Sequence, residues 1–449
     1  MAFACSECGH RSVKWFGRCP GCGAWDAFRE EPEEARKTGK TKDRSWLGEE
    51  LRPITHIDLA DVKRLPSGMA EFDRLLGGGL IPGGVILFGG EPGIGKSTLL
   101  LQIADSVARN TGNVLYVSGE ESEGQVKLRA SRLDVDSERL FVLSEQSLQR
   151  VVEAIETVSP KVLIIDSIQT VVSDGIDGEA GSVRQLREVS NELTRLTKSK
   201  RFTTFLVGHI TKDGAFAGPK TVEHLVDVAL YLEGSRGEDV RILRSVKNRF
   251  GATNEVAVFR MEEAGMREIA NPSSFFLEGH REDPRPGSVV MPVLEGSRPI
   301  LVELQALVSP TGGFGVPQRR CTGLDINRVL LLLAVIEKRM AVHIGAADVY
   351  LSVAGGLEAR ERASDLAAVA AIISSLRDRA IPAGTVVVGE VGLSGEVRAV
   401  RRLNERLREA AKMGYDRMIV PGTAAQRLDG VEIVPVGSIE DALSELELG

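Results

Sequence analysis

The clearest chemical signal in the chain is a run of glycines that ends in a lysine and a serine. An apolar run, Val85 to Phe88, leads into Gly90-Glu-Pro-Gly-Ile-Gly-Lys96-Ser97, and a helical pattern follows. The spacing is G-x-x-x-x-G-K-[ST] between a strand and a helix, which binds nucleotide phosphates through backbone amides and the helix dipole. We therefore predict an ATP-binding loop that comprises Gly90, Glu91, Pro92, Gly93, Ile94, Gly95, Lys96, Ser97 and Thr98.

Three further apolar runs end in side chains that suit phosphate chemistry. Lys96 is expected to reach the β- and γ-phosphates, while the Ser97 hydroxyl ligates Mg²⁺. KVLIID ends in Asp166, a carboxylate suited to holding Mg²⁺ through water. NVLYVSGEES ends in Glu120 and Glu121, either of which could polarise the attacking water or be an exposed acid. The apolar run in TTFLVGHI is followed by His209, a candidate γ-phosphate sensor.

A second signal lies at the N-terminus, where two C-x-x-C pairs occur close together. The pairs CSEC and CPGC contain Cys5, Cys8, Cys19 and Cys22. Two such turns can close a tetrahedral thiolate site, which is the structural Zn²⁺ pattern. A pair of disulfides is disfavoured in a cytoplasmic chain, and a redox site needs only one pair. We therefore predict a zinc site here.

The composition is that of an ordinary globular protein with several domains. The chain has 449 residues, 43% hydrophobic and 27% charged, with a net charge of −7. This length favours two or three domains, and the negative balance argues against a protein that coats nucleic acid throughout. We see no secretory signal pattern at the N-terminus, and the longest apolar run, VLLLLAVI, is far shorter than a membrane span. We therefore expect a cytoplasmic protein without a membrane partner.

Changes in residue pattern divide the chain into four segments. Residues 1–29 hold the four-cysteine finger, residues 30–66 form a charged linker and entry segment, and residues 67–270 form the ATPase domain. In residues 271–449, SVVMPVLEGSRPILVELQALV indicates strands and ASDLAAVAAIISSLRD an amphipathic helix. GTVVVGEVGLSGEVRAVRRLNERLREAAKMG indicates strands followed by a basic helix.

The order of these motifs resembles that of one known family. SGMAEFDRLLGGGLIPGGVILFGGEPGIGKST is similar to the RecA-type ATPase core, and the whole chain resembles the bacterial RadA/Sms family. The resemblance covers essentially the full length and includes KNRFG at Lys247, Asn248, Arg249, Phe250 and Gly251, which is specific to that family. It implies an α/β fold: a RecA-like P-loop ATPase core, a small N-terminal zinc module and an α/β Lon-protease-like C-terminal domain.

The resemblance also implies roles for individual residues. Glu120 stands where RecA-like ATPases have their catalytic glutamate, and His209 where RecA has a strand-end glutamine. Loops that follow the strands ending in Asp166 and His209 correspond to loops that line the pore of RecA-like rings and hold single-stranded DNA. The loop Val171 to Ser182 is acidic, whereas Ile210 to Thr221 offers Lys212, Phe216 and Lys220 for DNA binding.

The VKNRFG stretch places two cations two residues apart after an apolar strand. Strand geometry puts Lys247 and Arg249 on the same face. RecA has Lys-Asn-Lys at the resembling position, where the cations reach the nucleotide of the next subunit. The resemblance thus implies that both are trans-acting fingers on the γ-phosphate, with DNA contact as the second interpretation. Gly251 would let the chain turn, and Phe250 is expected to pack against the neighbouring subunit.

The C-terminal segment resembles the Lon proteolytic domain, whose chemistry needs a serine nucleophile and a lysine base. Ser364 aligns with the serine, but Asn404 stands at the lysine position and cannot take up a proton. We therefore expect a non-proteolytic scaffold that helps subunits form a ring. Its cations offer either a DNA surface or a solvated helix face: Arg398, Arg401, Arg402, Arg406, Arg408 and Lys412.

Three functions remain open at this point. The first, favoured by the resemblance, is a DNA-dependent ATPase and helicase-like motor on single-stranded and branched DNA in recombinational repair. It implies a homo-hexameric ring, a RecA-type recombinase partner, nucleoid association, and ATP, Mg²⁺ and Zn²⁺ as cofactors. The second is a Lon-type protease, which Asn404 opposes. The third is a nucleotide-switched binding protein, which the set Lys96, Ser97, Glu120 and Asp166 opposes.

Overall fold

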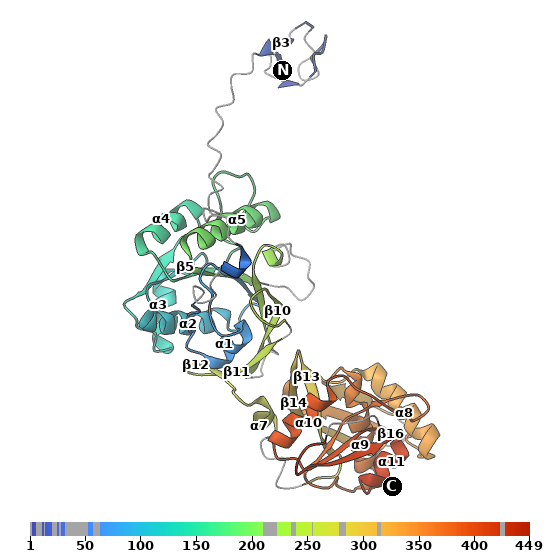
Figure 1. The fold of residues 1–449 in the computed structure, drawn as a ribbon. Coiled ribbons are helices and arrows are strands. Elements are labelled where there is room, and N and C mark those ends of the chain that lie inside the picture. Colours follow the sequence, from blue (N-terminus) through green and yellow to red (C-terminus); the bar gives the residue numbers. More distant parts are fainter. Residues whose placement is uncertain are drawn as a thin grey trace. The chain divides into compact units, whose positions relative to one another are not determined.

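The computed structural model divides the chain into two compact units, Met1–Leu59 and Ala60–Gly449 (Figure 1). The structure describes residues 2–5, 11–12, 14–19, 25–26, 28–31, 53–56, 63–209, 222–234, 239–253, 255–277, 284–311, 316–422 and 427–449. Each unit is described by itself below. Within the described residues, no helix is both long and apolar enough to cross a membrane.

The first unit contains a small antiparallel sheet. Its strands, in the order β2-β1-β3, are β1 (Ala2–Cys5), β2 (Arg11–Ser12) and β3 (Phe28–Glu31), and a 3₁₀ turn, η2, spans Ile54–His56. Arg18 and Trp25 form an isolated bridge, with the guanidinium 5.6 Å from the centre of the indole ring. Cys19, next to this bridge, is buried.

The second unit begins with a nine-stranded sheet in the order β12-β11-β10-β9-β4-β8-β7-β5-β6. The strands are β4 (Val85–Gly90), β5 (Val114–Ser118), β6 (Leu140–Ser144), β7 (Val162–Asp166), β8 (Thr203–His209), β9 (Val228–Glu233), β10 (Val240–Asn248), β11 (Val256–Glu262) and β12 (Gly265–Glu268). The six from β9 to β6 run parallel, and β10, β11 and β12 continue the sheet antiparallel. The carboxyl ends of the parallel strands therefore meet at one edge.

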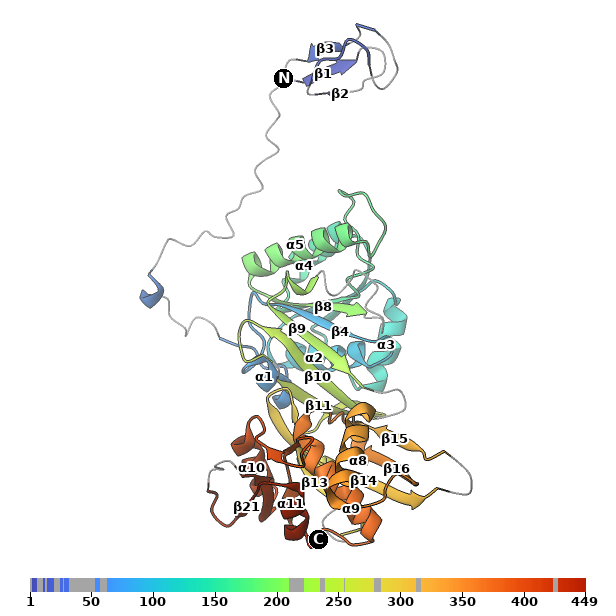
Figure 2. The same cartoon turned by 90° about the vertical axis from the view of Figure 1, so that its right-hand side faces the viewer.

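Helices cover both faces of this sheet (Figure 2). They are α1 (Ala70–Leu76), α2 (Lys96–Asn110), α3 (Glu123–Arg132), α4 (Leu148–Val158) and α5 (Val183–Lys200). Alternation along β4 sends Ile86 and Phe88 into one apolar core with α1, α2 and α3. Val85 and Leu87 enter the other core, with α4 and α5. A parallel sheet buried on both faces explains the nearly continuous apolar runs of these strands.

A second sheet follows the short helix α7 (Pro272–Phe276) and has the order β15-β16-β14-β13-β17-β20-β21. Its strands are β13 (Ser288–Glu295), β14 (Arg298–Pro310), β15 (Arg319–Thr322), β16 (Ala347–Val353), β17 (Thr385–Val387), β20 (Arg417–Pro421) and β21 (Glu432–Val436), with a separate hairpin of β18 (Glu390–Val391) and β19 (Val397–Arg398). The helices are α8 (Ile326–Met340), α9 (Asp365–Arg377), α10 (Leu403–Lys412) and α11 (Ile439–Glu445), with 3₁₀ turns η4 (Ala354–Gly356) and η5 (Arg362–Ser364).

The structure differs from the sequence prediction at α9. We expected an amphipathic helix, but residues 365–374 are all buried. The helix packs on β13 and β14 and is also in contact with α8, α11 and β18. Alanines and short polar side chains give such a helix no charged face to turn towards solvent. The predicted α/β class is confirmed, whereas the four segment boundaries remain a prediction.

Candidate nucleotide site

The glycine-rich loop joins β4 to α2 at the carboxyl edge of the first sheet. Gly93 and Gly95 have φ values of 78° and 112°, in the left-handed region that favours glycine. A Cβ on Gly95 would also lie 2.2 Å from the end of the Met266 side chain, so a larger residue would require that methionine to move. Lys96 is buried and its Nζ donates to the carbonyl oxygens of Gly90 and Glu91, each at 2.9 Å. Lys96 therefore stabilises the conformation of the loop to which it belongs.

The loop is braced from β10 by a buried arginine that sequence reasoning missed. Arg241 Nε donates to the carbonyl oxygen of Ile94 at 3.1 Å. An arginine in the alternating strand VRILRSV reads as a solvent-facing residue, because nothing near it in sequence indicates a buried acceptor. The carbonyl that it meets lies 147 residues away in the chain.

Three of the predicted site residues meet in one chain of contacts. Lys96 Nζ lies 3.1 Å from His209 Nδ1, and His209 Nε2 lies 3.4 Å from Glu120 Oε1. The same Glu120 oxygen accepts a hydrogen bond from Ser167 Oγ at 2.7 Å. His209 therefore stands between the lysine of the phosphate loop and the carboxylate predicted to orient water.

Burial changes the proton affinities of these groups. It lowers the pKa of Lys96 to about 8, against the opposing pull of Asp166 and Glu120. Burial, followed by the nearby Lys96 charge, also lowers the pKa of His209, although Glu120 and Asp166 favour its charged form. A neutral imidazole near pH 7 accepts from the Lys96 ammonium at Nδ1, which leaves the proton on Nε2 facing Glu120.

The structure distinguishes between the two adjacent glutamates. Glu120 faces His209, whereas Glu121 turns away and pairs with Arg129 of α3 at 2.5 Å. Of these two glutamates, only Glu120 therefore points towards His209 and the lysine of the loop. The sequence alone left both residues open, since they follow the same strand.

Asp166 lies at the end of β7, and its carboxylate contacts a tyrosine that sequence reasoning missed. Tyr116 Oη, in β5, donates to Asp166 Oδ2 at 2.5 Å, and the Ser97 side chain hydrogen-bonds the same phenol. Burial, followed by the Asp166 charge, raises the pKa of Tyr116 well above its usual value. Serine hydroxyl and aspartate oxygens are hard ligands, so Ser97 and Asp166 fit a Mg²⁺ site.

Of the two loops predicted to contact DNA, the structure describes the first and not the second. The acidic loop after β7 is pinned by Gln185 of α5, whose Oε1 accepts from Ser173 N at 2.9 Å and whose Nε2 donates to the carbonyl oxygen of Ile176 at 2.6 Å. Gln169 ties the start of this loop to β8, since its Nε2 donates to the carbonyl oxygen of His209 at 3.1 Å. The second loop, with Lys212, Phe216 and Lys220, lies outside the described residues.

The KNRFG stretch lies at the opposite end of the sheet from the phosphate loop. Asn248 pairs with Val228, which pairs with Ile86 near the start of β4. The phosphate loop follows Gly90 at the other end of β4, a strand of six residues that spans about 16 Å. The two cations therefore lie far from the phosphate loop of their own chain.

Both cations of KNRFG contact the segment from Glu223 to Asp227. Lys247 Nζ donates to the carbonyl oxygens of Glu223 and His224, at 2.8 and 3.3 Å. Arg249 Nη1 lies 3.3 Å from Asp227 Oδ1, and the guanidinium side chain is 58% exposed. Burial and the neighbouring Arg249 charge lower the pKa of Lys247.

Asp227 binds several groups at this end of the sheet, although nothing in the local sequence indicates that role. It is buried and accepts from Val85 N at 3.2 Å, from Lys198 Nζ at 3.1 Å and from Arg249. One carboxylate thus satisfies the first amide of β4 and holds two cations. The acid directly precedes the apolar strand VALYLE, where it reads as an ordinary loop residue.

The other three residues of KNRFG make contacts within their own chain. Asn248 Oδ1 accepts from Phe250 N at 2.9 Å, and its Nδ2 donates to the carbonyl oxygen of Leu75 at 3.3 Å. Phe250 is partly buried against the core of its own chain, beside Gly84, while its packing on a neighbouring subunit remains a prediction. A Cβ on Gly251 would lie 2.9 Å from the Asn248 amide, so the close turn requires glycine.

The region aligned with the protease dyad is closed by buried contacts. Ser364 is buried, and its Oγ is within hydrogen-bond distance of the carbonyl oxygens of Ala359 and Glu361, at 3.1 and 2.6 Å. Arg406, two residues after Asn404, is fully buried and forms a bidentate pair with Glu361 at 2.5 and 2.7 Å. Arg406 was therefore wrongly counted among the cations of a DNA surface.

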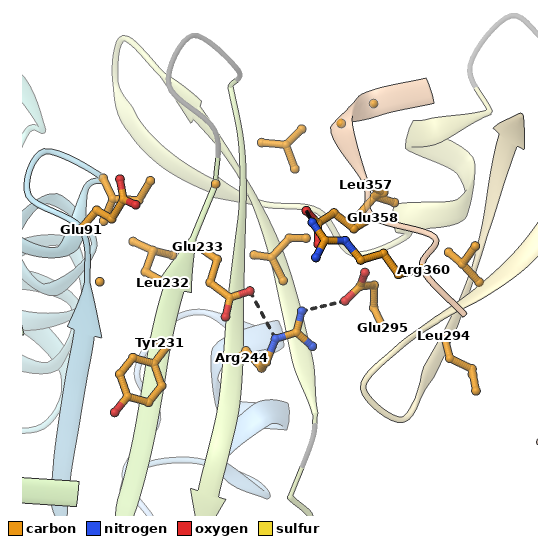
Figure 3. A pocket seen from close by; sticks show the side chains of 18 of the residues that line it. Glu91, Tyr231, Leu232, Glu233, Arg244, Leu294, Glu295, Leu357, Glu358 and Arg360 are labelled. Carbon is orange, nitrogen blue, oxygen red and sulfur yellow. Dashed lines mark hydrogen bonds and ion pairs between the residues drawn. The ribbon is translucent and has the colours of Figure 1, made fainter. Parts of the chain in front are cut away.

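A cavity of about 750 Å³ lies between the start of the phosphate loop and the turn before Ser364 (Figure 3). Arg244 of β10 lines this cavity. Its Nε lies 3.3 Å from Glu233, and its Nη2 lies 2.8 Å from Glu295 of β13. Burial raises the pKa of Glu295. The arginine thus links the two sheets of the second unit through an ion pair that sequence reasoning missed.

The structure describes only part of the predicted zinc site. Cys19 is buried, and the backbone of Cys5 ends β1. Cys8, Cys22 and the side chain of Cys5 lie outside the described residues. Four cysteines in two C-x-x-C pairs are a donor set that fits Zn²⁺.

Comparison with protein families assigns two segments of the chain. Residues 51–215 match the family model described as an AAA domain, and residues 3–30 match the rubredoxin metal binding domain. Among solved structures, a KaiC-like protein of Pyrococcus horikoshii OT3 is 22% identical, with a TM-score of 0.40; the match covers 46% of this chain and 99% of that one.

The curated relatives match along the whole chain. The DNA repair protein RadA of Halalkalibacterium halodurans is 47% identical, with 100% of this chain and 98% of the relative covered. The proteins of the same name from Bacillus subtilis and Aquifex aeolicus are 46% and 45% identical, with 98% and 99% of this chain and 97% and 98% of the relatives covered. The chain therefore belongs to the family of RadA DNA repair proteins, with a RecA-like AAA ATPase domain and an N-terminal metal-binding ribbon.

Proposed function

We propose that the chain is a DNA-stimulated ATPase and helicase-like motor that promotes branch migration on recombination intermediates. The observation that carries this proposal is the split arrangement of the ATPase sheet. One end gathers Lys96, His209 and Glu120, and the other holds Arg249 far from them. A finger that cannot serve its own nucleotide fits a ring in which each site is completed by the next subunit.

The residues at the carboxyl end have separate roles in ATP hydrolysis. Lys96 and the loop amides bind the β- and γ-phosphates, which requires Lys96 to exchange its contact with His209 for phosphate oxygens. Glu120 accepts a hydrogen bond from the attacking water and thereby orients and polarises it. Mg²⁺, when bound at Ser97 and Asp166, supplies neutralisation of phosphate charge. Lys247 and Arg249 of the neighbouring subunit stabilise the charge that develops on the γ-phosphate.

His209 provides a path from the nucleotide to DNA. When Lys96 turns to phosphate, the imidazole loses the donor at Nδ1 and its hold on Glu120 changes. The backbone of His209 is hydrogen-bonded to Gln169, at the root of the acidic loop, and the chain continues into the loop with Lys212, Phe216 and Lys220. We propose that these two loops hold single-stranded DNA and move with the state of the nucleotide.

The rest of the proposal concerns the other segments. The N-terminal cysteines hold Zn²⁺, and the Lon-like C-terminal region is a non-proteolytic scaffold of a homo-hexameric ring. The buried Arg406–Glu361 pair beside Ser364, together with Asn404, supports this reading over a Lon-type protease. The protein works in the cytoplasm on nucleoid DNA, with a RecA-type recombinase as partner.

The test is branch migration by the purified protein on a three-strand recombination intermediate. We expect movement with ATP but not with a non-hydrolysable analogue, and faster ATP turnover when forked or single-stranded DNA is present. Equal turnover with and without DNA would instead favour a nucleotide-switched binding protein. Casein cleavage that is lost in Ser364→Ala would restore the protease interpretation.

A further inference from the structure

A tyrosine hydroxyl lies between the two side chains expected to hold Mg²⁺. Tyr116 is 1% exposed in the middle of β5. Its Oη lies 2.5 Å from Asp166 Oδ2, and a hydrogen bond from the Ser97 side chain acts to lower the pKa of the phenol, against the larger effect of burial. Ser97 is the second residue of α2, and Asp166 ends β7, so the phenol lies between two elements of the nucleotide site.

The chemistry of the three groups determines the direction of this hydrogen-bond chain. A carboxylate can only accept, so the Tyr116 hydroxyl donates its single proton to Asp166. The phenol oxygen is then available as an acceptor, so the Ser97 hydroxyl donates to it. The order is therefore Ser97 to Tyr116 to Asp166.

This direction is the one that a serine ligand of a cation needs. A hydroxyl that binds a metal ion presents a lone pair to the ion and must send its proton elsewhere. Tyr116 provides the acceptor for that proton in a buried place where water does not compete.

We propose that Tyr116 is a positioning residue for Mg²⁺-nucleotide binding, acting through Ser97 and Asp166. The inference rests on the proposed ATPase function and names a residue that the phosphate-loop motif does not contain. The simpler alternative is a core tyrosine whose hydroxyl merely finds a partner. The two differ in one respect: a core role affects nucleotide binding equally with and without Mg²⁺, whereas a positioning role affects only the Mg²⁺-dependent part.

The test compares wild type and Tyr116→Phe in titrations with a fluorescent ADP analogue, once with Mg²⁺ and once with EDTA. Removing an outer-shell partner of a metal site costs about 10- to 100-fold in metal affinity. We therefore expect the affinity in Mg²⁺ to fall about tenfold and the affinity in EDTA to stay within about twofold. The Mg²⁺ concentration for half-maximal ATP turnover should rise by a similar factor, with turnover recovering at high Mg²⁺.

A double-mutant cycle with Ser97→Ala separates positioning from packing. If Tyr116 acts through Ser97, the substitution Tyr116→Phe should add less in the Ser97→Ala background than in wild type. Tyr415→Phe, at a buried tyrosine between α10 and β20, is the matched control and should change neither titration. Tyr116→Met, an adaptable apolar replacement, repeats the measurement if the phenylalanine variant does not fold.

Equal losses in Mg²⁺ and EDTA, or an unchanged Mg²⁺ dependence, would overturn the role of Tyr116. Those outcomes leave the ATPase proposal intact as long as wild type hydrolyses ATP. If wild type shows neither Mg²⁺-dependent nucleotide binding nor hydrolysis, the proposed function itself fails.

Discussion

The two ends of the ATPase sheet hold their charged groups in different ways. At the carboxyl end, Lys96, His209 and Glu120 contact one another and form a site around the phosphate loop. At the amino end, Lys247 is held by backbone carbonyl oxygens and Arg249 by the buried Asp227, with most of the Arg249 side chain exposed. The first end has the parts of a nucleotide site, while the second presents cations outwards without a site of their own.

The two ends therefore differ in what each can do within a single chain. The carboxyl end should bind nucleotide within one chain, because its lysine, hydroxyl and carboxylate all come from that chain. The amino end should contribute only when a second copy brings its phosphate loop to the exposed guanidinium. Substitutions at the carboxyl end should therefore affect nucleotide binding and turnover, whereas those at the amino end should affect turnover alone.

The largest effect is expected for Lys96→Ala. Loss of the buried ammonium, which also caps the carbonyl oxygens of Gly90 and Glu91, should abolish turnover and weaken nucleotide binding. Equilibrium binding of a fluorescent nucleotide and steady-state ATP hydrolysis measure the two effects. Lys200→Ala, at an exposed lysine that pairs with Glu156, is the control.

Arg249→Ala should uncouple the two quantities. Arginine fingers contribute about 10³- to 10⁵-fold in turnover, so we expect a loss of about 10³-fold with nucleotide affinity unchanged. Arg249→Lys should recover little, because a lysine lacks the planar fork of the guanidinium. Arg139→Ala, at an exposed arginine beside the edge strand β6, should behave as wild type. A matching drop in affinity would mean that Arg249 supports its own chain instead.

Asp227→Asn tests whether the finger must be held in place. The amide keeps the shape and an oxygen for Val85 N, but it removes the charge that holds Lys198 and Arg249. We expect a roughly tenfold loss of turnover, equivalent to about 1.4 kcal/mol, with unchanged nucleotide affinity. The melting temperature should also fall, because a buried partner of two cations is neutralised. Faster turnover would show that Asp227 restrains the finger rather than positions it.

The smallest effect is a pH dependence of nucleotide binding. Burial lowers the pKa of Lys96 to about 8, and phosphate oxygens favour the ammonium form. Below about pH 8 the lysine is already charged, so affinity should not depend on this group. Above it, binding must take up a proton, and affinity should fall by up to about tenfold per pH unit. Calorimetry at pH 9 in two buffers of different ionisation enthalpy measures that uptake, which Lys96→Ala should remove.

The carboxyl end could be predicted from sequence because its residues follow local rules. A phosphate loop has a distinctive spacing, and side chains at the ends of neighbouring parallel strands must meet at one edge. The expectation that His209 lies near Lys96 therefore needed only strand boundaries. Glu120 and Glu121 could not be separated, since the ion pair of Glu121 with Arg129 depends on how α3 packs.

The amino end and the supporting residues depend on contacts between distant parts of the chain. Asp227 and Tyr116 looked like a loop acid and a core aromatic, because their partners are far away in sequence. Arg406 looked like a surface cation, although Glu361, 45 residues earlier, buries it as a pair. A polar residue inside an otherwise apolar strand, such as Tyr116 in VLYVS, is the one signal that could have indicated a buried network.

The most direct test of the central claim mixes two inactive variants. Lys96→Ala has an intact finger but no phosphate loop, and Arg249→Ala has an intact loop but no finger. If the finger acts on the next subunit, random mixing in a ring should restore about a quarter of the interfaces, and ATP turnover should reappear. If mixed rings form, as verified by co-purification through a tag on one variant, and turnover stays at the level of the separate variants, Arg249 does not act in trans.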